Sequence, residues 1–307
     1  MHEPPAGYET ILTTRRSRKT REAGFVLTAV GIASQSYRRD GYWHLIVREG
    51  DVSRALGELE AYHKENRERA DERSVVEPTY QGAAVGVVVY LVVIGLFATL
   101  AGRWMLGWDW LSIGQMHAAS VLSGEYWRVV TALTLHLDAS HLVANLIFGG
   151  VFGFLAGRLF GGGVAWLIVV LAGALGNGLN AIVQHPEHTS IGASTGVFAA
   201  LGMLVAHALQ SSRADRQREH TASRARPMKR WSPLIAGVVL FGLLGIGDER
   251  TDVGAHAAGF VSGMLGGAIG YRLPRRWLAD HRCQGISGGL AVAIVCAAWL
   301  WGVAASS

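Results

Sequence analysis

The sequence predicts an all-α polytopic membrane protein preceded by a small soluble α+β domain. Half of the 307 residues are hydrophobic, only 17% are charged and 40 are glycine. The mean hydropathy is positive, at +0.26, and soluble chains rarely combine these values. The apolar residues are also unevenly placed, because residues 1–77 are polar and rich in charge whereas several later stretches lack Lys, Arg, Asp and Glu. The chain therefore divides into a soluble head and a membrane body.

The membrane body contains seven apolar stretches that are long enough to cross a bilayer, because a crossing helix needs about 17 to 25 residues with its polar ends included. These stretches are residues 82–102, 142–157, 163–184, 191–210, 231–247, 253–271 and 284–303. We therefore expect seven transmembrane helices.

Basic residues indicate the orientation of these helices. Residues 213–230 hold seven Lys or Arg against two acidic residues, so this loop is expected on the cytoplasmic side. The segments before the first stretch and after the second and sixth are also basic and fall on the same side by alternation. The opposite loops are poor in basic residues, with none in QHPEHTS and only Arg250 in DERTD. We expect a cytoplasmic N-terminus and an outer C-terminus.

The net charge of +5 does not indicate a nucleic-acid partner. The basic residues cluster beside apolar segments, as orienting charges at a membrane do. Two cysteines, Cys283 and Cys296, are too few for a disulfide framework. The sequence does not indicate an oligomeric state.

The head has the pattern of a small cytosolic α+β domain, residues 1–77. Residues 24–34 and 41–49 are expected to form two strands around an Asp40-Gly41 turn, and residues 51–70 to form a helix with one apolar face. The alternative is a secretory or twin-arginine signal, because RRSRKTR precedes the apolar GFVLTAVGIAS. Export of the head would contradict the remaining charge pattern, so the cytosolic domain is favoured.

Polar residues cluster at the outer ends of the second, fourth and sixth predicted helices. These helices run in the same direction, so their N-terminal ends share one side of the membrane. HLVAN holds His141 and Asn145, GASTG holds Ser194, and GAHAAG holds His256. Each group lies within a few turns of its helix start, at about 1.5 Å per residue. All four side chains are therefore expected in one layer below the outer surface.

These residue types fit acyl transfer by a serine nucleophile. A serine hydroxyl needs a neutral imidazole to accept its proton, which Ser194 and His256 supply. A carbonyl that becomes tetrahedral needs hydrogen-bond donors, which His141, Asn145 and backbone N–H groups at the helix start supply. Asp252 is expected to be exposed and to take no part, which leaves a Ser-His dyad.

Two other interpretations of Ser194 are open at this point. Serine is common where small residues let membrane helices touch, and glycines and alanines surround Ser194 and His256. The spacing of Gly192, Ser194 and Gly196 also matches the nucleophile elbow of soluble hydrolases, but that motif requires a preceding strand. The shared depth of four polar residues favours the catalytic interpretation.

Together these residues resemble the rhomboid family of intramembrane serine proteases, over roughly residues 83–275. WRVVTALTLHLDASHLVANL, residues 127–146, is similar to the family segment that carries a Trp-Arg pair and the His and Asn of the second helix. GAST is similar to the family's Gly-x-Ser-Gly, and GAHAAGFVSGMLGG to its sixth-helix motif. The resemblance implies Ser194 as nucleophile, His256 as general base, and His141 and Asn145 at the oxyanion.

The same resemblance implies a rhomboid-like six-helix core, residues 78–278, followed by a seventh transmembrane helix, residues 279–307. It implies an endopeptidase of a bacterial inner membrane that cleaves transmembrane clients near the outer face, without a metal or cofactor. Two positions depart from the family pattern. Thr195 stands where glycine usually follows the serine, and Gly157 stands where many bacterial members carry a buried glutamate.

Two further hypotheses are weaker. A catalytically silent binder or quality-control factor for membrane helices would explain Thr195, but it has no need of both Ser194 and His256. A transporter would require charged residues at the centres of its crossings, and the predicted crossings carry none there.

Overall fold

A computed structural model describes residues 5–74, 79–102, 105–218, 227–245 and 251–307. The chain divides into two compact units, Met1–Glu77 and Pro78–Ser307. Arg224 and Arg226 of the basic loop, and Arg250 of the DERTD loop, lie outside the described residues.

The first unit is a three-stranded antiparallel sheet with two helices. Its strands are β1 (Tyr8–Thr14), β2 (Ser34–Arg39) and β3 (Tyr42–Arg48), in the order β1-β3-β2. The β2–β3 hairpin turns at Asp40 and Gly41, both with positive φ, as a two-residue turn of this kind requires. A short 3₁₀ turn, η1 (Glu49–Asp51), leads into helix α2 (Val52–Ser74), which covers residues 52–70 of the predicted helix.

The predicted strand over residues 24–34 is wrong except at Ser34, where β2 begins, because residues 24–29 belong to helix α1 (Ser17–Ala29) and residues 30–33 form the connection to β2. Thr20, Ala23 and Leu27 share one face of this helix and are buried against the sheet and α2. The helix ends at Ala29, and Gly31, which follows the C-cap residue Val30, has a φ of 76° that is typical of the position after a helix C-terminus. The β-branched residues that suggested a strand are outweighed by this buried face.

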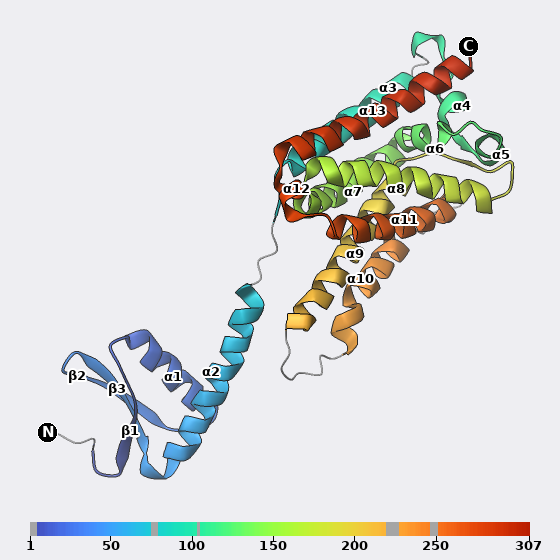
Figure 1. Cartoon of the computed structure of the whole chain (residues 1–307). Coiled ribbons are helices and arrows are strands. Elements are labelled where there is room, and N and C mark those ends of the chain that lie inside the picture. Colours follow the sequence, from blue (N-terminus) through green and yellow to red (C-terminus); the bar gives the residue numbers. More distant parts are fainter. Residues whose placement is uncertain (1–4, 75–78, 103–104, 219–226, 246–250) are drawn as a thin grey trace. The chain divides into compact units, whose positions relative to one another are not determined.

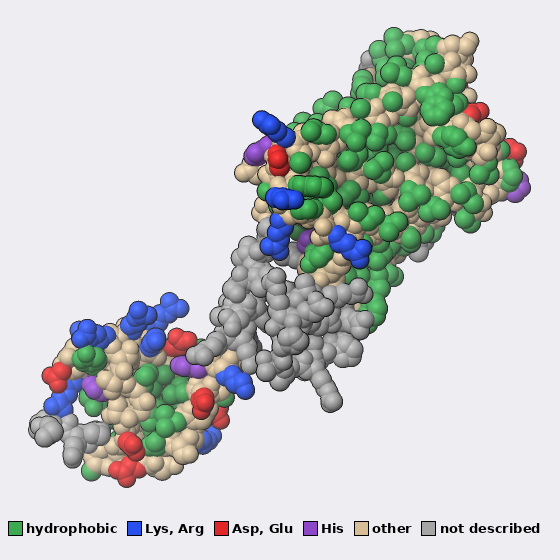
Figure 2. Space-filling model, in the orientation of Figure 1, with side chains coloured by type: hydrophobic (Ala, Val, Ile, Leu, Met, Phe, Trp, Pro, Cys, Tyr) green, Lys and Arg blue, Asp and Glu red, His purple; other side chains and the backbone are tan. Residues whose placement is uncertain are grey.

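Within the described residues of the second unit, six helices are long and apolar enough to span a membrane. They are α3 (Ala83–Gly102), α7 (Ala139–Phe160), α8 (Gly162–Val183), α9 (Ser194–Arg218, with the span at Ser194–Ser212), α11 (Val253–Tyr271) and α13 (His281–Ala305). The predicted fifth crossing coincides with α10 (Pro227–Gly245), whose described apolar part, Trp231–Leu244, is shorter. The chain is a multi-pass membrane protein, and Figure 2 shows that hydrophobic side chains dominate the visible surface of this unit.

Short elements join α3 to α7 and form a structured loop. They are η2 (Met105–Gly107), α4 (Trp110–Gly114), β4 (Met116–His117), α5 (Ala118–Leu122), α6 (Arg128–Thr131) and η3 (Ala132–Thr134). Strand β4 pairs with β5 (Thr189–Ser190), which lies between α8 and α9. Arg128 braces the loop by donating to the carbonyls of Ser112 and Gln115, at 2.7 and 2.9 Å. Strand β5, which precedes Ser194, is thus paired with a loop that Arg128 stabilises.

Helix α9 passes behind α11 and continues beside α10 (Figure 1), and 61% of its span is buried against 17% for α3. It packs on α11 in a parallel register. Cβ atoms added at Gly259, Gly263 and Gly267 would lie 2.3, 2.0 and 2.7 Å from atoms of Thr195, Ala199 and Met203, respectively. Such close approach requires glycine on α11. The face of α9 in this contact is that of Thr195, Ala199 and Met203.

Helix α13 is packed into the bundle, chiefly against α8 and α6, and the short helix α12 (Arg275–Ala279) precedes it. The Trp299 ring stacks on Phe97, with centroids 4.8 Å apart, and its indole N–H donates to Thr134 Oγ1 at 3.1 Å. The seventh helix therefore supports the segment that leads into the start of α7.

Candidate active site

The N-terminal ends of α7, α9 and α11 meet around one cavity of about 480 Å³. Because α9 and α11 are parallel and in contact, their first turns lie at the same end of the bundle, which we call the site end. The cavity is lined by all four residues singled out in the sequence, Ser194, His256, His141 and Asn145. Polar groups from Asp138, Ser140, Ser190, Thr251 and Asp252 also line it.

Ser194 is the first residue of α9 and is half-buried at the cavity wall. The first N–H groups of a helix have no partner within the helix, and the helix dipole favours negative charge there. The hydroxyl thus lies where an anionic oxygen would be stabilised.

Gly192 keeps the space between Ser194 and His141 open. Its φ is 137°, and its N–H is held by the Ala132 carbonyl at 2.9 Å. A Cβ at this position would lie 2.8 Å from His141 Nε2 and 3.3 Å from Ser194 Oγ. Both polar atoms therefore border a gap that only glycine leaves free.

His256 lies in the first turn of α11 and is 7% exposed. Its ring packs on Phe198, with centroids 4.4 Å apart. Phe198 follows Ser194 by four residues, so the two side chains share one face of α9. This contact holds the imidazole against the face of α9 that carries the serine.

His141 and Asn145 lie one turn apart on α7 and face the same cavity. Asp138 caps this helix by accepting the His141 N–H at 2.8 Å. The Asn145 amide nitrogen is buried, and no described residue accepts a hydrogen bond from it. A buried donor without a partner is unfavourable, and it is satisfied if an acceptor enters the cavity.

Asp252 is not exposed as expected, because its side chain is only 15% accessible. It caps α11 through the Ala255 N–H at 2.9 Å and also binds Asn180 Nδ2 at 2.7 Å and His188 Nε2 at 2.8 Å. Burial alone would raise the pKa of Asp252, but the hydrogen bonds from the Ala255 N–H, His188 and Ser190, together with the charge of His188, outweigh it and hold the pKa below its ordinary value. The carboxylate thus ties the start of α11, one turn before His256, to α8 and the β5 loop.

His136 lies just before α7 and packs edge-on against His141, with ring centroids 5.3 Å apart. Burial, with a smaller contribution from His141, lowers the pKa of His136 to about 4, although the Thr134 backbone opposes the shift. The side chain is therefore neutral at pH 7.

The two positions that depart from the family pattern have packing roles. Thr195 is 2% exposed, and its methyl group lies in the contact between Gly176 of α8 and Gly259 of α11. A Cβ at Gly157 would lie 2.9 Å from Ala83, so this glycine lets α7 approach the start of α3.

Sequence reasoning missed three contributors to the site: Phe198, the Gly192 gap, and the Asp252 cluster with Asn180 and His188. Phe198 was detectable from its spacing of four residues from Ser194. The Asp252 cluster joins residues that are far apart in the chain, so no local pattern indicates it.

Comparison with known proteins agrees with this architecture. Residues 123–273 match the family model of the rhomboid domain. The rhomboid protease GluP of Bacillus subtilis (strain 168) is 26% identical over 159 residues, which are 52% of this chain and 29% of that protein. The putative rhomboid protease YdcA of the same organism is 25% identical over 117 residues, 38% of this chain and 58% of that protein.

A third relative is the rhomboid-like protease 3 of Toxoplasma gondii, 33% identical over 94 residues, which are 31% of this chain and 35% of that protein. The matched regions thus cover less than two thirds of the length of each relative. The family-model match includes the N-terminal ends of α7, α9 and α11, where the cavity lies. By this match and these relatives, the chain belongs to the rhomboid family.

Proposed function

We propose that this protein is an intramembrane serine endopeptidase that cleaves transmembrane clients near the outer face of a bacterial inner membrane. The observation that carries the proposal is the convergence of Ser194, His256 and the unpartnered Asn145 amide on one cavity. Membership of the rhomboid family, with relatives named as proteases, supports the same activity.

In the proposed reaction, Ser194 Oγ attacks the carbonyl carbon of the scissile peptide while His256 accepts the hydroxyl proton. The carbonyl oxygen becomes an oxyanion, and His141, the Asn145 amide and the first N–H groups of α9 donate to it. His256 then gives its proton to the leaving amine, and an acyl-enzyme remains on Ser194. Water, deprotonated by His256, releases the acyl group and restores the serine.

The cavity suits a client that enters from the bilayer. Its polar lining lies at the N-terminal ends of membrane spans, and the proposed reaction requires that water reach it there. A client helix must unwind locally to present its carbonyl, since helical carbonyls are already hydrogen-bonded. Apolar residues of the same cavity, Phe148, Phe152 and Val197, provide a surface for client side chains.

The packing of Thr195 bears on the alternative of a silent binder. Its methyl group lies in the contact between α8 and α11. The substitution thus has a packing explanation and gives the binder no specific support.

Reaction with a fluorophosphonate probe tests the nucleophile and the base without knowledge of the client. We expect the purified full chain to be labelled, and Ser194→Ala and His256→Ala to lose the label. Ser262→Ala is the matched control, because Ser262 is a buried serine of α11 whose hydroxyl has no partner among the described residues. It should label like the parent. A folded parent that stays unlabelled would overturn the proposal.

A further inference from the structure

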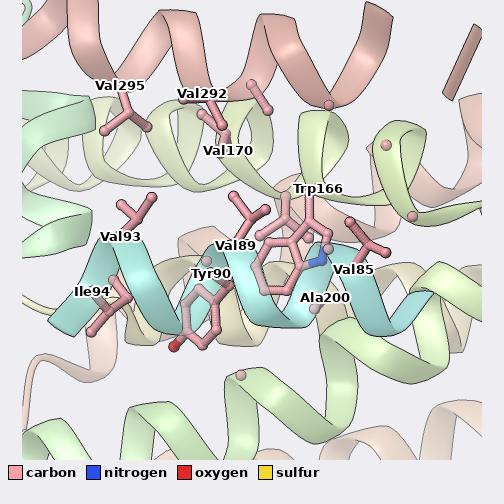
Figure 3. Close-up of a pocket in the computed structure, with 18 of the residues that line it drawn as sticks. Val85, Val89, Tyr90, Val93, Ile94, Trp166, Val170, Ala200, Val292 and Val295 are labelled. Atoms are coloured by element: carbon pink, nitrogen blue, oxygen red, sulfur yellow. The ribbon is translucent and has the colours of Figure 1, made fainter. Parts of the chain in front are cut away.

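A second cavity, of about 440 Å³, lies between α3, α8, α9 and α13. Its walls are almost wholly apolar. Figure 3 shows Val85, Val89 and Val93 along α3, with Val292 and Val295 on α13. Gly162, Gly163 and Gln284 line the end of the cavity opposite the site end. This region takes no part in the proposed reaction.

The cavity is elongated. Its lining extends along α3 from Gly82 to Ile94, which is roughly 18 Å at the helical rise. Its apolar walls and its volume of about 440 Å³ suit a single extended hydrocarbon chain.

One polar atom of a residue that lines the cavity lacks a partner among the described residues. The Trp166 indole N–H is buried, and no described residue accepts a hydrogen bond from it. The ring is stacked on Tyr90, with centroids 4.7 Å apart, and lies against Gly86, where a Cβ would be 2.5 Å from Nε1. Trp166 follows the start of α8 by four residues, about 6 Å of rise. The donor therefore lies about one helical turn inside the α8 span.

Basic side chains surround this end of the bundle. Arg158 is exposed, and its carbonyl accepts the Tyr80 N–H at 2.8 Å, next to Gly82 of the cavity wall. Arg282 is exposed two residues before Gln284, another lining residue. Arg272, Arg275 and Arg276 are exposed at the same end, where Figure 2 shows Lys and Arg side chains together.

We propose that this cavity binds one acyl chain of an anionic phospholipid. The chain fills the apolar space, an ester carbonyl accepts the Trp166 N–H, and the phosphate lies near Arg158 and Arg282. Apolar cavities between membrane spans favour hydrocarbon over water, and basic pockets between such helices bind anionic headgroups. The hydrogen bond requires an acceptor at the depth of the Trp166 N–H, which is where an ester group lies.

Native mass spectrometry of the delipidated full chain with phosphatidylglycerol tests the cavity. Gly289 of α13 lines it, and a Cβ there meets nothing within 4 Å. We expect Gly289→Leu to fill the space and lower the retained lipid about tenfold, a loss of about 1.4 kcal/mol. Gly95→Leu is the matched control, because Gly95 of α3 also has free space around its Cβ but does not line the cavity. Equal retention by both variants would overturn the proposal.

An ether-linked phosphatidylglycerol, which has no ester carbonyl, tests the hydrogen bond. The parent should retain the ester lipid about fivefold better than the ether lipid, and Trp166→Phe should lose this preference. Arg158→Ala combined with Arg282→Ala should remove the preference for phosphatidylglycerol over phosphatidylcholine.

A photoreactive acyl chain should label residues 85–94 and 285–295 of the parent. If Gly289→Leu fails to fold, the photolabelling and the comparison of ester with ether lipid still test the proposal. Labelling spread evenly over all membrane helices, or no ester preference in the parent, would contradict the proposal.

Discussion

The imidazole of His256 lies on the ring of Phe198, with the two ring centroids 4.4 Å apart. Phe198 follows Ser194 by one helical turn, so one aromatic contact relates the proposed base on α11 to the proposed nucleophile on α9. The parallel packing of α9 on α11 keeps both helix starts at this level.

This contact predicts that Phe198 positions His256. Phe198→Leu removes the aromatic face, so we expect fluorophosphonate labelling to fall about tenfold and its pH dependence to shift with the freed imidazole. Phe198→Tyr keeps the ring and should restore the parent rate. A parent-like rate and pH profile in Phe198→Leu would contradict the positioning role.

The gap at Gly192 predicts a second loss of activity. Gly192→Ala places a Cβ 2.8 Å from His141 Nε2 on a backbone with φ of 137°, so it displaces a donor of the proposed oxyanion site. We expect labelling to fall about a hundredfold, the effect of losing one such donor. Gly178→Ala on α8 meets nothing within 4 Å and should label normally. Equal rates in the two variants would show that the gap has no role.

The packing of Thr195 predicts a loss of stability when it is changed to the usual family residue. Thr195→Gly opens the contact with Gly176 and Gly259 and places glycine in a helix. We expect about 2 kcal/mol of destabilisation, measured by unfolding in detergent, with no gain in labelling. Thr195→Ser, which removes only the methyl group, should lie between parent and Thr195→Gly. Faster labelling of Thr195→Gly would instead mean that Thr195 restricts the site.

The lowered pKa of Asp252 predicts acid sensitivity. A carboxyl group whose pKa is lower in the folded than in the unfolded state adds stability above its unfolded pKa of about 3.9. This contribution is lost as the pH falls through the folded pKa. Asp252→Asn can still cap α11 but carries no charge, so its unfolding free energy should depend less on pH in this acidic range. An unchanged pH dependence would mean that Asp252 is not the group responsible.

The distribution of basic residues predicts the orientation in the membrane. Arg158, Arg272, Arg275, Arg276 and Arg282 are exposed at the end opposite the site, and basic residues favour the cytoplasmic side. A fluorescent protein fused at the N-terminus should fluoresce, and alkaline phosphatase fused after Ser307 should be active outside. The reverse pattern would place the proposed active site on the cytoplasmic side.

Six of the seven predicted crossings coincide with helices long enough to span a membrane. Hydropathy is a property of consecutive residues, so a single sequence contains it. The first strand and the first helix of the head could not be predicted from consecutive residues in this way. The run GFVLTA has strand-forming residues, but Ala23 and Leu27 are buried on one face of α1 by the sheet and α2, and this packing overrides local preference.

The sequence by itself determined the membrane class, the division into two parts and the placement of Ser194, His256, His141 and Asn145 near helix starts. These follow from local composition and from spacing along one helix. Only the tertiary structure decided that α9 contacts α11 through Thr195 and that the His256 ring packs on Phe198. It also decided that Asp252 forms hydrogen bonds with both Asn180 and His188. Such contacts depend on which faces of distant helices touch, and small residues permit several faces to do so. The choice among them is made by the packing of the whole bundle.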